Sequence, residues 1–271
     1  TRHTMAAAAP AAGDEAPVAR CAPGWWKYGA GDRPARVQLD LSKVRLQQAE
    51  ISGDYNIWYN RHSGDRSRGR SAPAATRCHL DTDSGLTQPD YTQGRAALCI
   101  HFAKGACGYG ANCTYRHRAP MDEDEAATES RLDVFGRERH GSFKDNMGGV
   151  GSWSQDNRTL YVGRICVTGT ESEVHATVYN HFAEWGDIEY VRVLMAKGCA
   201  FVAYRLRAAA EFAKEAMMDQ SLDHGEQLNV RWAYEDPNPK AKADKLRVQA
   251  GIMLEAMRKR GHAPDAETLA R

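Results

Sequence analysis

Four potential metal ligands in one short segment constrain this chain more than any other feature. Three cysteines and a histidine follow one another with seven, five and three residues between them: Cys99, Cys107, Cys113 and His117. Three thiolates and an imidazole at such spacing suit tetrahedral coordination of a zinc ion. Metal binding would supply folding free energy that so small a segment cannot obtain from burial. The pattern therefore predicts a zinc finger with one structural Zn²⁺.

The same ligand set bears on catalysis. Because protein side chains fill all four positions, no position remains at which the metal could activate a water molecule. The sequence also shows no nucleophile paired with a general base. We therefore expect a protein that is not an enzyme.

The remaining cysteines do not extend the ligand pattern. The chain has seven cysteines, an odd number, and its first residues do not resemble a secretory signal. Reduced thiols are expected in such a chain, so clustered cysteines indicate a metal site rather than disulfides. Cys78 is left out of the site, and His79 and His101 are interpreted as surface or metal-adjacent residues. The sequence contains no apolar stretch of about 18 residues, so it predicts no membrane-spanning helix.

Positive charge and aromatic rings are concentrated around the finger. The whole chain has a net charge of +1, but residues 58–118 carry eight arginines and a lysine against four aspartates. Cationic grooves with stacking rings are typical of proteins that bind single-stranded nucleic acid. A solvated loop remains the alternative for Arg61, Arg68 and Arg70. Core packing is expected for two of the six rings, Trp58 and Phe102, and the others are Tyr59, Tyr91, Tyr109 and Tyr115.

The second half of the chain predicts a βαββαβ order. Strands are expected at residues 159–164, around 188–194, at 198–204 and around 228–232. Between the first two strands, Val174, Val178 and Phe182 share one helical face, and Gly186 ends that helix. Residues 208–218 are strong helix formers. This order is that of the split βαβ sandwich.

Two motifs make this sandwich an RNA recognition motif. Residues 197–204 read KGCAFVAY and match the RNP1 pattern at seven of eight positions. Residues 160–165, LYVGRI, fill the RNP2 position. Strand alternation places Tyr161, Cys199 and Phe201 on the open face of the sheet. The two rings can each stack a base, worth about 1–3 kcal/mol, and Lys197 can meet a phosphate. Cys199 stands where an aromatic ring is usual, so a sheet that binds protein remains the alternative.

The chain divides by composition into five parts. Residues 1–24 are interpreted as disordered, 25–120 as a loop-rich domain with the finger, 121–156 as a connector, 157–236 as the RNA recognition motif and 237–271 as a helical tail. The acidic run at residues 122–125 is interpreted as solvated linker. In the tail, an apolar stripe either packs on its own domain or binds a partner: Leu246, Ala250, Met253, Leu254 and Met257.

The motifs together resemble a known family. The matches are residues 56–60 (NIWYN), the spacing of the finger, residues 135–138 (FGRE) and 147–149 (MGG), the cysteine in RNP1, and residues 232–233 (WA) and 235–237 (EDP). On these residues the chain resembles the fungal Cwc-two-type pre-mRNA-splicing factors, which are associated with the Nineteen Complex. The resemblance implies an α+β fold, in which a torus-like domain with the zinc finger is docked on the RNA recognition motif.

The resemblance also implies partners and contacts. It implies a nuclear protein that contacts U6 snRNA and the intron and helps to hold the catalytic RNA of the spliceosome in its active conformation. It implies Nineteen Complex binding through the C-terminal region. RNA contacts are carried over to Tyr161, Cys199, Phe201 and Phe143. Relatives carry a tryptophan where this chain has His62, so stacking there would be weaker or replaced by hydrogen bonding. A protein-interaction adaptor with only secondary RNA binding is the alternative.

Overall fold

The computed structural model describes residues 33–40, 55–56, 61–62, 73–92, 96–127 and 131–234, together with scattered positions between 247 and 258. The expected disorder of residues 1–24 and most of the motif at residues 56–60 lie outside these ranges. The chain forms two units, Thr1–Ala233 and Tyr234–Arg271. Within the second unit, the described positions Ala250, Leu254 and Met257 are helical, as the apolar stripe predicts. In the described part of the chain, no helix has the length and apolar character needed to cross a membrane.

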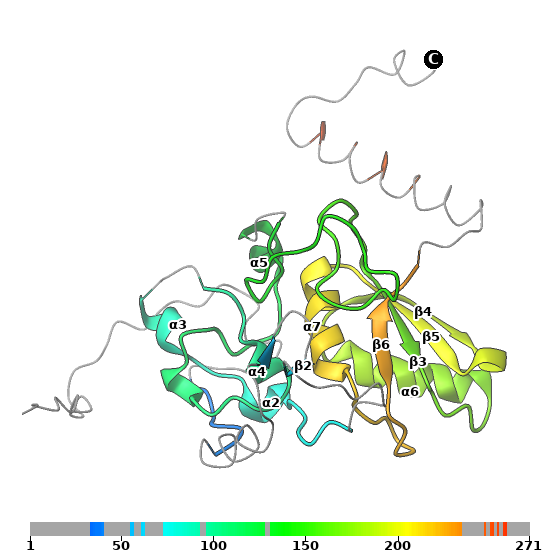
Figure 1. Cartoon of the computed structure of the whole chain (residues 1–271), viewed down its shortest axis with the longest axis horizontal. Helices are drawn as coiled ribbons and strands as arrows, with labels where there is room; N and C mark the ends of the chain where they lie inside the picture. The colour runs from blue at the N-terminus through cyan, green and yellow to red at the C-terminus, as the bar shows by residue number, and fades with distance from the viewer. Residues whose placement is uncertain are drawn as a thin grey trace, which may run out of the picture. The chain divides into compact units, whose positions relative to one another are not determined.

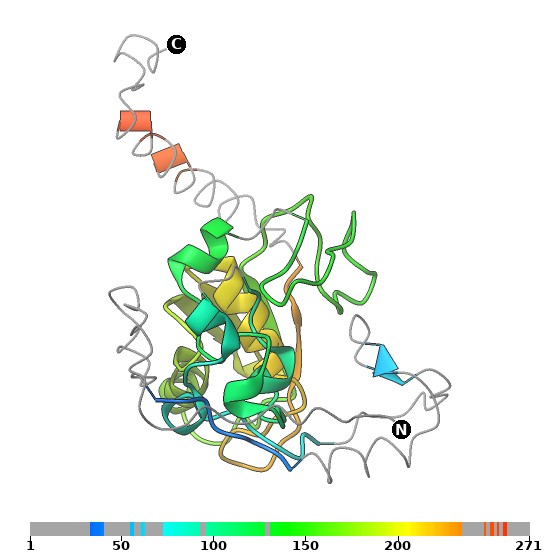
Figure 2. The same cartoon turned by 90° about the vertical axis from the view of Figure 1, so that its left-hand side faces the viewer.

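The first unit contains the predicted antiparallel sheet, in the order β4-β5-β3-β6. Its strands are β3 (Thr159–Gly163), β4 (Ile188–Leu194), β5 (Cys199–Tyr204) and β6 (Asn229–Trp232). The connecting helices are α6 (Glu171–Ala183) and α7 (Arg207–Met217), which cover one face of the sheet (Figure 1). Figure 2 shows β6, in orange, as the edge strand beside α7. The βαββαβ prediction is therefore confirmed.

Local signals explain where α6 begins and how the covered face packs. Thr170 and Glu173 form a reciprocal capping box at the first turn of α6, which satisfies two otherwise unpaired backbone N–H groups. Val178 and Phe182 are buried against the sheet, and the Tyr204 hydroxyl donates to the Phe182 carbonyl at 2.8 Å. The predicted helical face thus forms the core of the RNA recognition motif.

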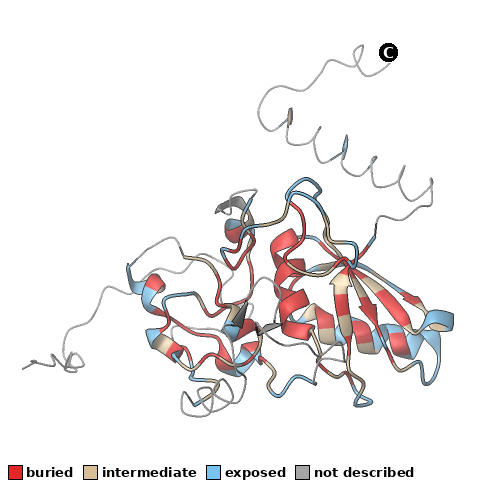
Figure 3. Ribbon diagram, viewed as in Figure 1, coloured by how far each residue is buried: buried red, intermediate tan, exposed pale blue. Residues whose placement is uncertain are grey.

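Helix α7 is buried along its whole length, as Figure 3 shows by its colour. One side packs on the sheet, and the other side packs on the finger-containing half of the unit. At the centre of this contact, the centroid of the Phe212 ring lies 5.7–6.2 Å from the centroids of three other rings: Phe102, Phe135 and Trp185. Of these, Phe102 belongs to the zinc-finger segment. The two halves therefore share one hydrophobic core.

Charged residues on α7 are buried with their partners. Glu215 accepts from Arg137 at 3.1 Å, and Glu211 is paired with Arg139 at 2.7 Å. Burial raises the pKa of Glu211 to about 7, although the two neighbouring arginines oppose that shift. Unpaired charges would be strongly unfavourable in this position, so the pairing fixes how α7 meets residues 131–139.

The finger-containing half is loop-rich, as predicted. Its described residues include the two-residue strands β1 (Tyr55–Asn56) and β2 (Arg61–His62) and several short helices. The helices are α2 (Leu80–Asp83), α3 (Gln88–Thr92), α4 (Ile100–Ala103), the 3-10 helix η2 (Gly110–Asn112) and α5 (Asp122–Ala127).

The expectation of a solvated acidic linker at residues 122–125 is wrong. These residues begin α5, and Asp124 is buried in a bidentate ion pair with Arg118, at 2.5 and 2.8 Å. The Asp124 carboxylate also accepts the Met121 N–H at 2.8 Å, which satisfies one amide at the start of the helix. A charge run becomes structural here because a buried arginine lies within reach.

The connector completes the sheet. The Trp232 backbone N–H donates to the Met147 carbonyl at 2.9 Å, and its indole N–H donates to the Gly149 carbonyl at 3.2 Å. Gly151 has φ +89°, and a Cβ there would stand 3.0 Å from the Trp232 ring. The glycine-rich segment therefore serves to approach edge strand β6 closely, and pairing with it protects that edge.

The shared core predicts that the two halves unfold together. Replacing Phe212 by alanine should lower the free energy of unfolding by about 3–5 kcal/mol, because a large ring leaves a closely packed site. Thermal unfolding followed by far-ultraviolet circular dichroism and by limited proteolysis within residues 96–120 should give the same lowered midpoint. Tyr179→Ala, which removes a ring exposed on α6, should change stability by less than about 0.5 kcal/mol. Two separate transitions in the Phe212 variant would contradict a shared core.

Candidate metal centre and nucleic-acid interface

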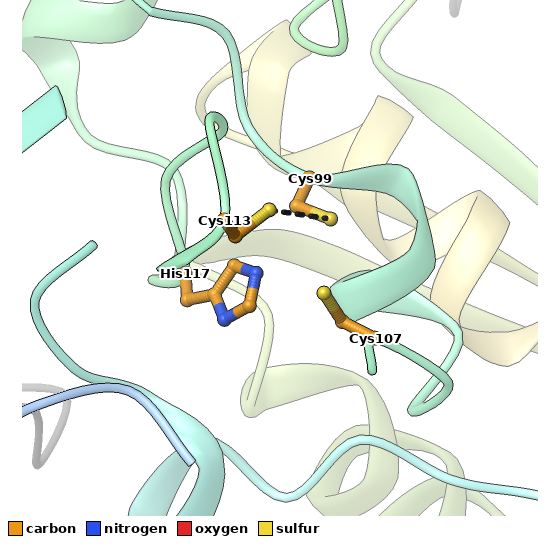
Figure 4. A group of neighbouring side chains, drawn as sticks. All are labelled: Cys99, Cys107, Cys113 and His117. Carbon is orange, nitrogen blue, oxygen red and sulfur yellow. Dashed lines mark hydrogen bonds between the residues drawn. The ribbon is translucent and has the colours of Figure 1, made fainter. Parts of the chain in front are cut away.

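The four predicted ligands converge on one point, as Figure 4 shows. All are buried, and their candidate ligand atoms lie within 4.8 Å of one another. The Cys99 and Cys113 sulfur atoms are 3.8 Å apart. In a tetrahedral zinc site with Zn–S bonds of about 2.3 Å, two sulfur atoms stand about 3.8 Å apart. The spacing of these two thiols is thus that of a metal-bound pair.

Short elements hold each ligand in place. Cys99 is the N-cap of α4, where its sulfur accepts the Phe102 N–H at 3.3 Å. Cys113 follows η2 directly, and the Cys107 N–H donates to the side-chain oxygen of Gln38 at 2.9 Å. The His117 ring is stacked on Phe102, with 4.7 Å between centroids and 11° between planes. The ligands are therefore positioned by the fold itself.

Two chemical observations show that the cluster suits a cation. Both ring nitrogens of His117 are buried, and neither has a hydrogen-bond partner among the described residues. The pKa of Cys107 is lowered by hydrogen bonds from Cys113 and Cys99. In return, the hydrogen bond with Cys107 raises the pKa of Cys113 to about 11 and also raises that of Cys99. A positive ion would stabilise all three cysteines as thiolates, so the cluster can hold a metal ion, and its donor set fits zinc.

The neighbouring cysteine and histidines lie outside the cluster, as the sequence predicts. Cys78 is buried, and His79 and His101 are exposed. None of the three belongs to the group of ligand atoms found in the described residues.

The sheet face opposite α6 and α7 carries the predicted ring pair. Tyr161 on β3 is the direct cross-strand partner of Phe201 on β5. Their ring centroids are 5.8 Å apart at an interplanar angle of 64°. Leu160 and Val162 are buried on the other side of the sheet, as strand alternation predicts. The structure therefore brings the two proposed stacking rings together.

Two arginines extend this pair into a row across all four strands. Arg192 on β4 lies opposite Phe201, and Arg231 on β6 lies opposite Tyr161. Arg231 is held by the side-chain oxygen of Asn229 at 2.8 Å and by the Asn146 carbonyl at 3.2 Å. Two rings flanked by two cations suit single-stranded nucleic acid. Strand alternation between buried neighbours could have assigned both arginines to this face, but only strand register shows that they flank the ring pair.

Cys199 and Lys197 differ in accessibility. Lys197 is exposed at the end of the 3-10 helix η3 (Met195–Lys197). Cys199 is on the open face, opposite Gly163, but only 3% of it is exposed. Tyr161 lies over Gly163 and interacts with the Cys199 thiol, and partial burial is the first cause that raises the pKa of Tyr161. The structure thus places Cys199 beneath the ring rather than on the accessible surface.

The two remaining expected contacts are Phe143 and His62. Phe143 is half-buried rather than exposed, and its ring is tilted at 58° to Trp232, with 6.3 Å between centroids. It therefore helps to dock the connector on β6 and keeps only part of its surface accessible. His62 belongs to β2, but its side chain lies outside the described part of the chain. RNA contacts at both residues remain predictions.

Two family models match the chain. Residues 30–137 match the Torus domain, and residues 160–226 match the RNA recognition motif. The first includes the metal cluster, and the second includes both rings of the open face. The buried ion pair of Arg137 with Glu215 joins the two matched regions.

Similar proteins are pre-mRNA-splicing factors. CWC2 of Pyricularia oryzae is 47% identical over 84% of this chain and 57% of its own length. The factor cwf2 of Schizosaccharomyces pombe is 46% identical over 78% of this chain and 54% of its own length. The cwc2 protein of Dictyostelium discoideum is 44% identical over 84% of this chain and 43% of its own length. The chain thus spans about half the length of these relatives.

Loss of one ligand should unfold the finger. Cys107→Ser removes the thiol with the lowered pKa, so we expect loss of bound zinc, measured by elemental analysis of purified protein, and a lower melting temperature. Cys166→Ser, at a half-buried cysteine outside the cluster, is the matched control and should keep the metal. Chelation of the unsubstituted protein should reproduce the effect of Cys107→Ser. Unchanged cooperative melting of metal-free protein would contradict a structural metal.

Proposed function

Since the chain belongs to the family of the CWC2 pre-mRNA-splicing factors, we propose that it binds RNA within the spliceosome and acts there without enzyme activity. The observation that carries this proposal is the open face of the sheet. There, Tyr161 and Phe201 form a ring pair between Arg192 and Arg231. Base stacking on such rings, with phosphates beside the cations, requires a single-stranded ligand.

The proposed ligands are U6 snRNA and the intron of the pre-mRNA. Support comes from the family motifs in the sequence and from the match to splicing factors over most of the chain. The protein would hold these RNAs in the conformation in which the RNA carries out splicing. Its own contribution is geometric, because rings fixed by a shared core can bind bases without first being ordered.

The metal in this proposal is one structural zinc ion held by the four clustered ligands. It fixes α4 and η2, and the Phe102 ring then links the His117 ligand to Phe212 of α7. Three exposed tyrosines of the same half can contact RNA beyond the sheet: Tyr91, Tyr109 and Tyr115. Zinc thus supports an RNA-holding surface rather than a reaction.

The proposal extends to location and partners. A splicing factor acts in the nucleus, and the family resemblance favours attachment to the Nineteen Complex through the tail beyond Pro239. The helical positions described between residues 247 and 258 are compatible with an apolar stripe that binds a partner.

A protein-interaction adaptor is the second candidate. Tyr179 is exposed on α6, stacked on His175, and α6 covers the other face of the sheet. A protein contact there would leave the open face available for RNA. The paired rings of that open face favour RNA binding as the primary function, because an adaptor does not require them.

The ring pair predicts a specific loss of RNA contact. The double variant Tyr161→Ala/Phe201→Ala should crosslink to U6 snRNA under ultraviolet light at least tenfold less than the unsubstituted protein, because each lost stack costs about 1–3 kcal/mol. Tyr179→Ala should crosslink normally. The melting temperature of each variant separates loss of contact from loss of fold. Unchanged crosslinking by a folded double variant would refute RNA binding by the open face.

The tail predicts a separable partner contact. Removal of residues 240–271 should reduce recovery of Nineteen Complex proteins in pull-down experiments, because the proposed docking helix is lost. RNA crosslinking should be unchanged, since the open face belongs to the other unit. Restoring the tail with Leu254→Asp and Met257→Asp should not restore recovery. Equal recovery with and without the tail would remove this assignment.

A further inference from the structure

Tyr190 on strand β4 is an exposed ring on the same face as Tyr161 and Phe201. It is 49% exposed, and its cross-strand partner is Ala203, which shares that face with Phe201. None of the RNA-binding motifs includes Tyr190. Its position nevertheless places it next to the ring pair, so its role rests on the proposed RNA binding by the open face.

A β-bulge puts Tyr190 on this face. Ile188 pairs with Tyr204, but Tyr190 pairs with Ala203, so Glu189 is an extra residue in β4. Counted from the Ile188–Tyr204 pair without the bulge, Glu189 would lie opposite Ala203 on the open face, and both Tyr190 and Arg192 would point into the core. Bulges of this kind re-aim a side chain, and they are common beside functional sites. Here the bulge replaces a carboxylate by an aromatic ring on a face that carries cations.

The three rings lie on three neighbouring strands of the sheet, β3, β5 and β4. Tyr161 and Phe201 are 5.8 Å apart. Tyr190 is the diagonal neighbour of Phe201, because Arg192 lies directly opposite Phe201 and Tyr190 is two residues away on the same face. Diagonal neighbours in an antiparallel pair are about 7–8 Å apart, still within contact of aromatic side chains. Such spacing allows successive bases of one strand to meet successive rings.

The third ring also compensates for the aromatic residue that the RNP1 motif of this chain lacks. Cys199 occupies the position at which a stacking ring is usual, and it is buried under Tyr161. The geometry points to Tyr190 as a third nucleobase-binding position, with Arg192 beside it for the intervening phosphate. The sheet therefore binds at least three consecutive bases of single-stranded RNA, and its binding surface is displaced towards edge strand β4.

The test uses the whole 271-residue chain loaded with zinc, and oligouridines of two to eight nucleotides that contain 5-iodouridine. Photocrosslinking followed by mass spectrometry of the tryptic peptides should identify an adduct at Tyr190. Tyr190→Ala should weaken binding about 5- to 100-fold for the longer oligomers but not for dinucleotides, which the ring pair alone can hold. Tyr190→Phe should bind like the unsubstituted protein, because it retains the ring.

Matched variants separate this inference from the function on which it rests. Tyr179→Ala, which removes a similarly exposed tyrosine from the helix-covered side, should bind RNA of every length normally. If Tyr190→Ala binds all lengths normally while Tyr161→Ala/Phe201→Ala fails, the third position is refuted and RNA binding by the sheet stands. If the folded double variant also binds normally, RNA binding by the open face is itself refuted. An equal loss for dinucleotides in Tyr190→Ala would likewise overturn a third position.

Discussion

The burial of α7 between two layers is the constraint on which the rest of this structure depends. In an isolated split βαβ sandwich, such a helix would present one side to water. Here both sides are covered, so Glu211 and Glu215 can remain in the interior only with Arg139 and Arg137 as partners. The ion pairs do not have to add net stability. They specify one docking geometry, because any shift would leave a buried carboxylate without its partner.

That geometry connects the metal cluster to the RNA-binding face through a short chain of packed rings. His117 is stacked on Phe102, Phe102 contacts Phe212, and α7 packs on the covered side of the sheet that carries Tyr161 on its open side. The cluster and the open face are therefore parts of one packed body. Rings on such a body lose little conformational entropy when a base stacks on them, which favours binding by a chain with a net charge of only +1.

Sequence reasoning succeeds here where a short-range pattern decides the structure. The ligand spacing predicts the metal cluster, and the RNP motifs predict strand order and the Tyr161–Phe201 pair. It fails where burial with a particular partner decides. The acidic run folds into α5 because Arg118 receives Asp124, and Phe143 is half-buried because Trp232 lies beside it. Trp232 is far from Phe143 in the sequence, whereas Arg118 lies only six residues before Asp124, and charge alone does not say that this pair is buried. The row of Arg192 and Arg231 across the four strands appears only once strand register is known.

The bulge in β4 is the clearest example of a side-chain direction that the local sequence does not determine. Strict alternation from Ile188, which faces the core, assigns Tyr190 to the core and Glu189 to the open face. One extra residue reverses that assignment. The consequence is electrostatic as well as geometric, because the same reversal turns Arg192 to the open face and removes Glu189 from the position opposite Ala203, which favours phosphate binding. Alternation counted from Ile188 and alternation counted from Val193 give opposite faces for Tyr190, and the pairing of β4 with β5 decides between them.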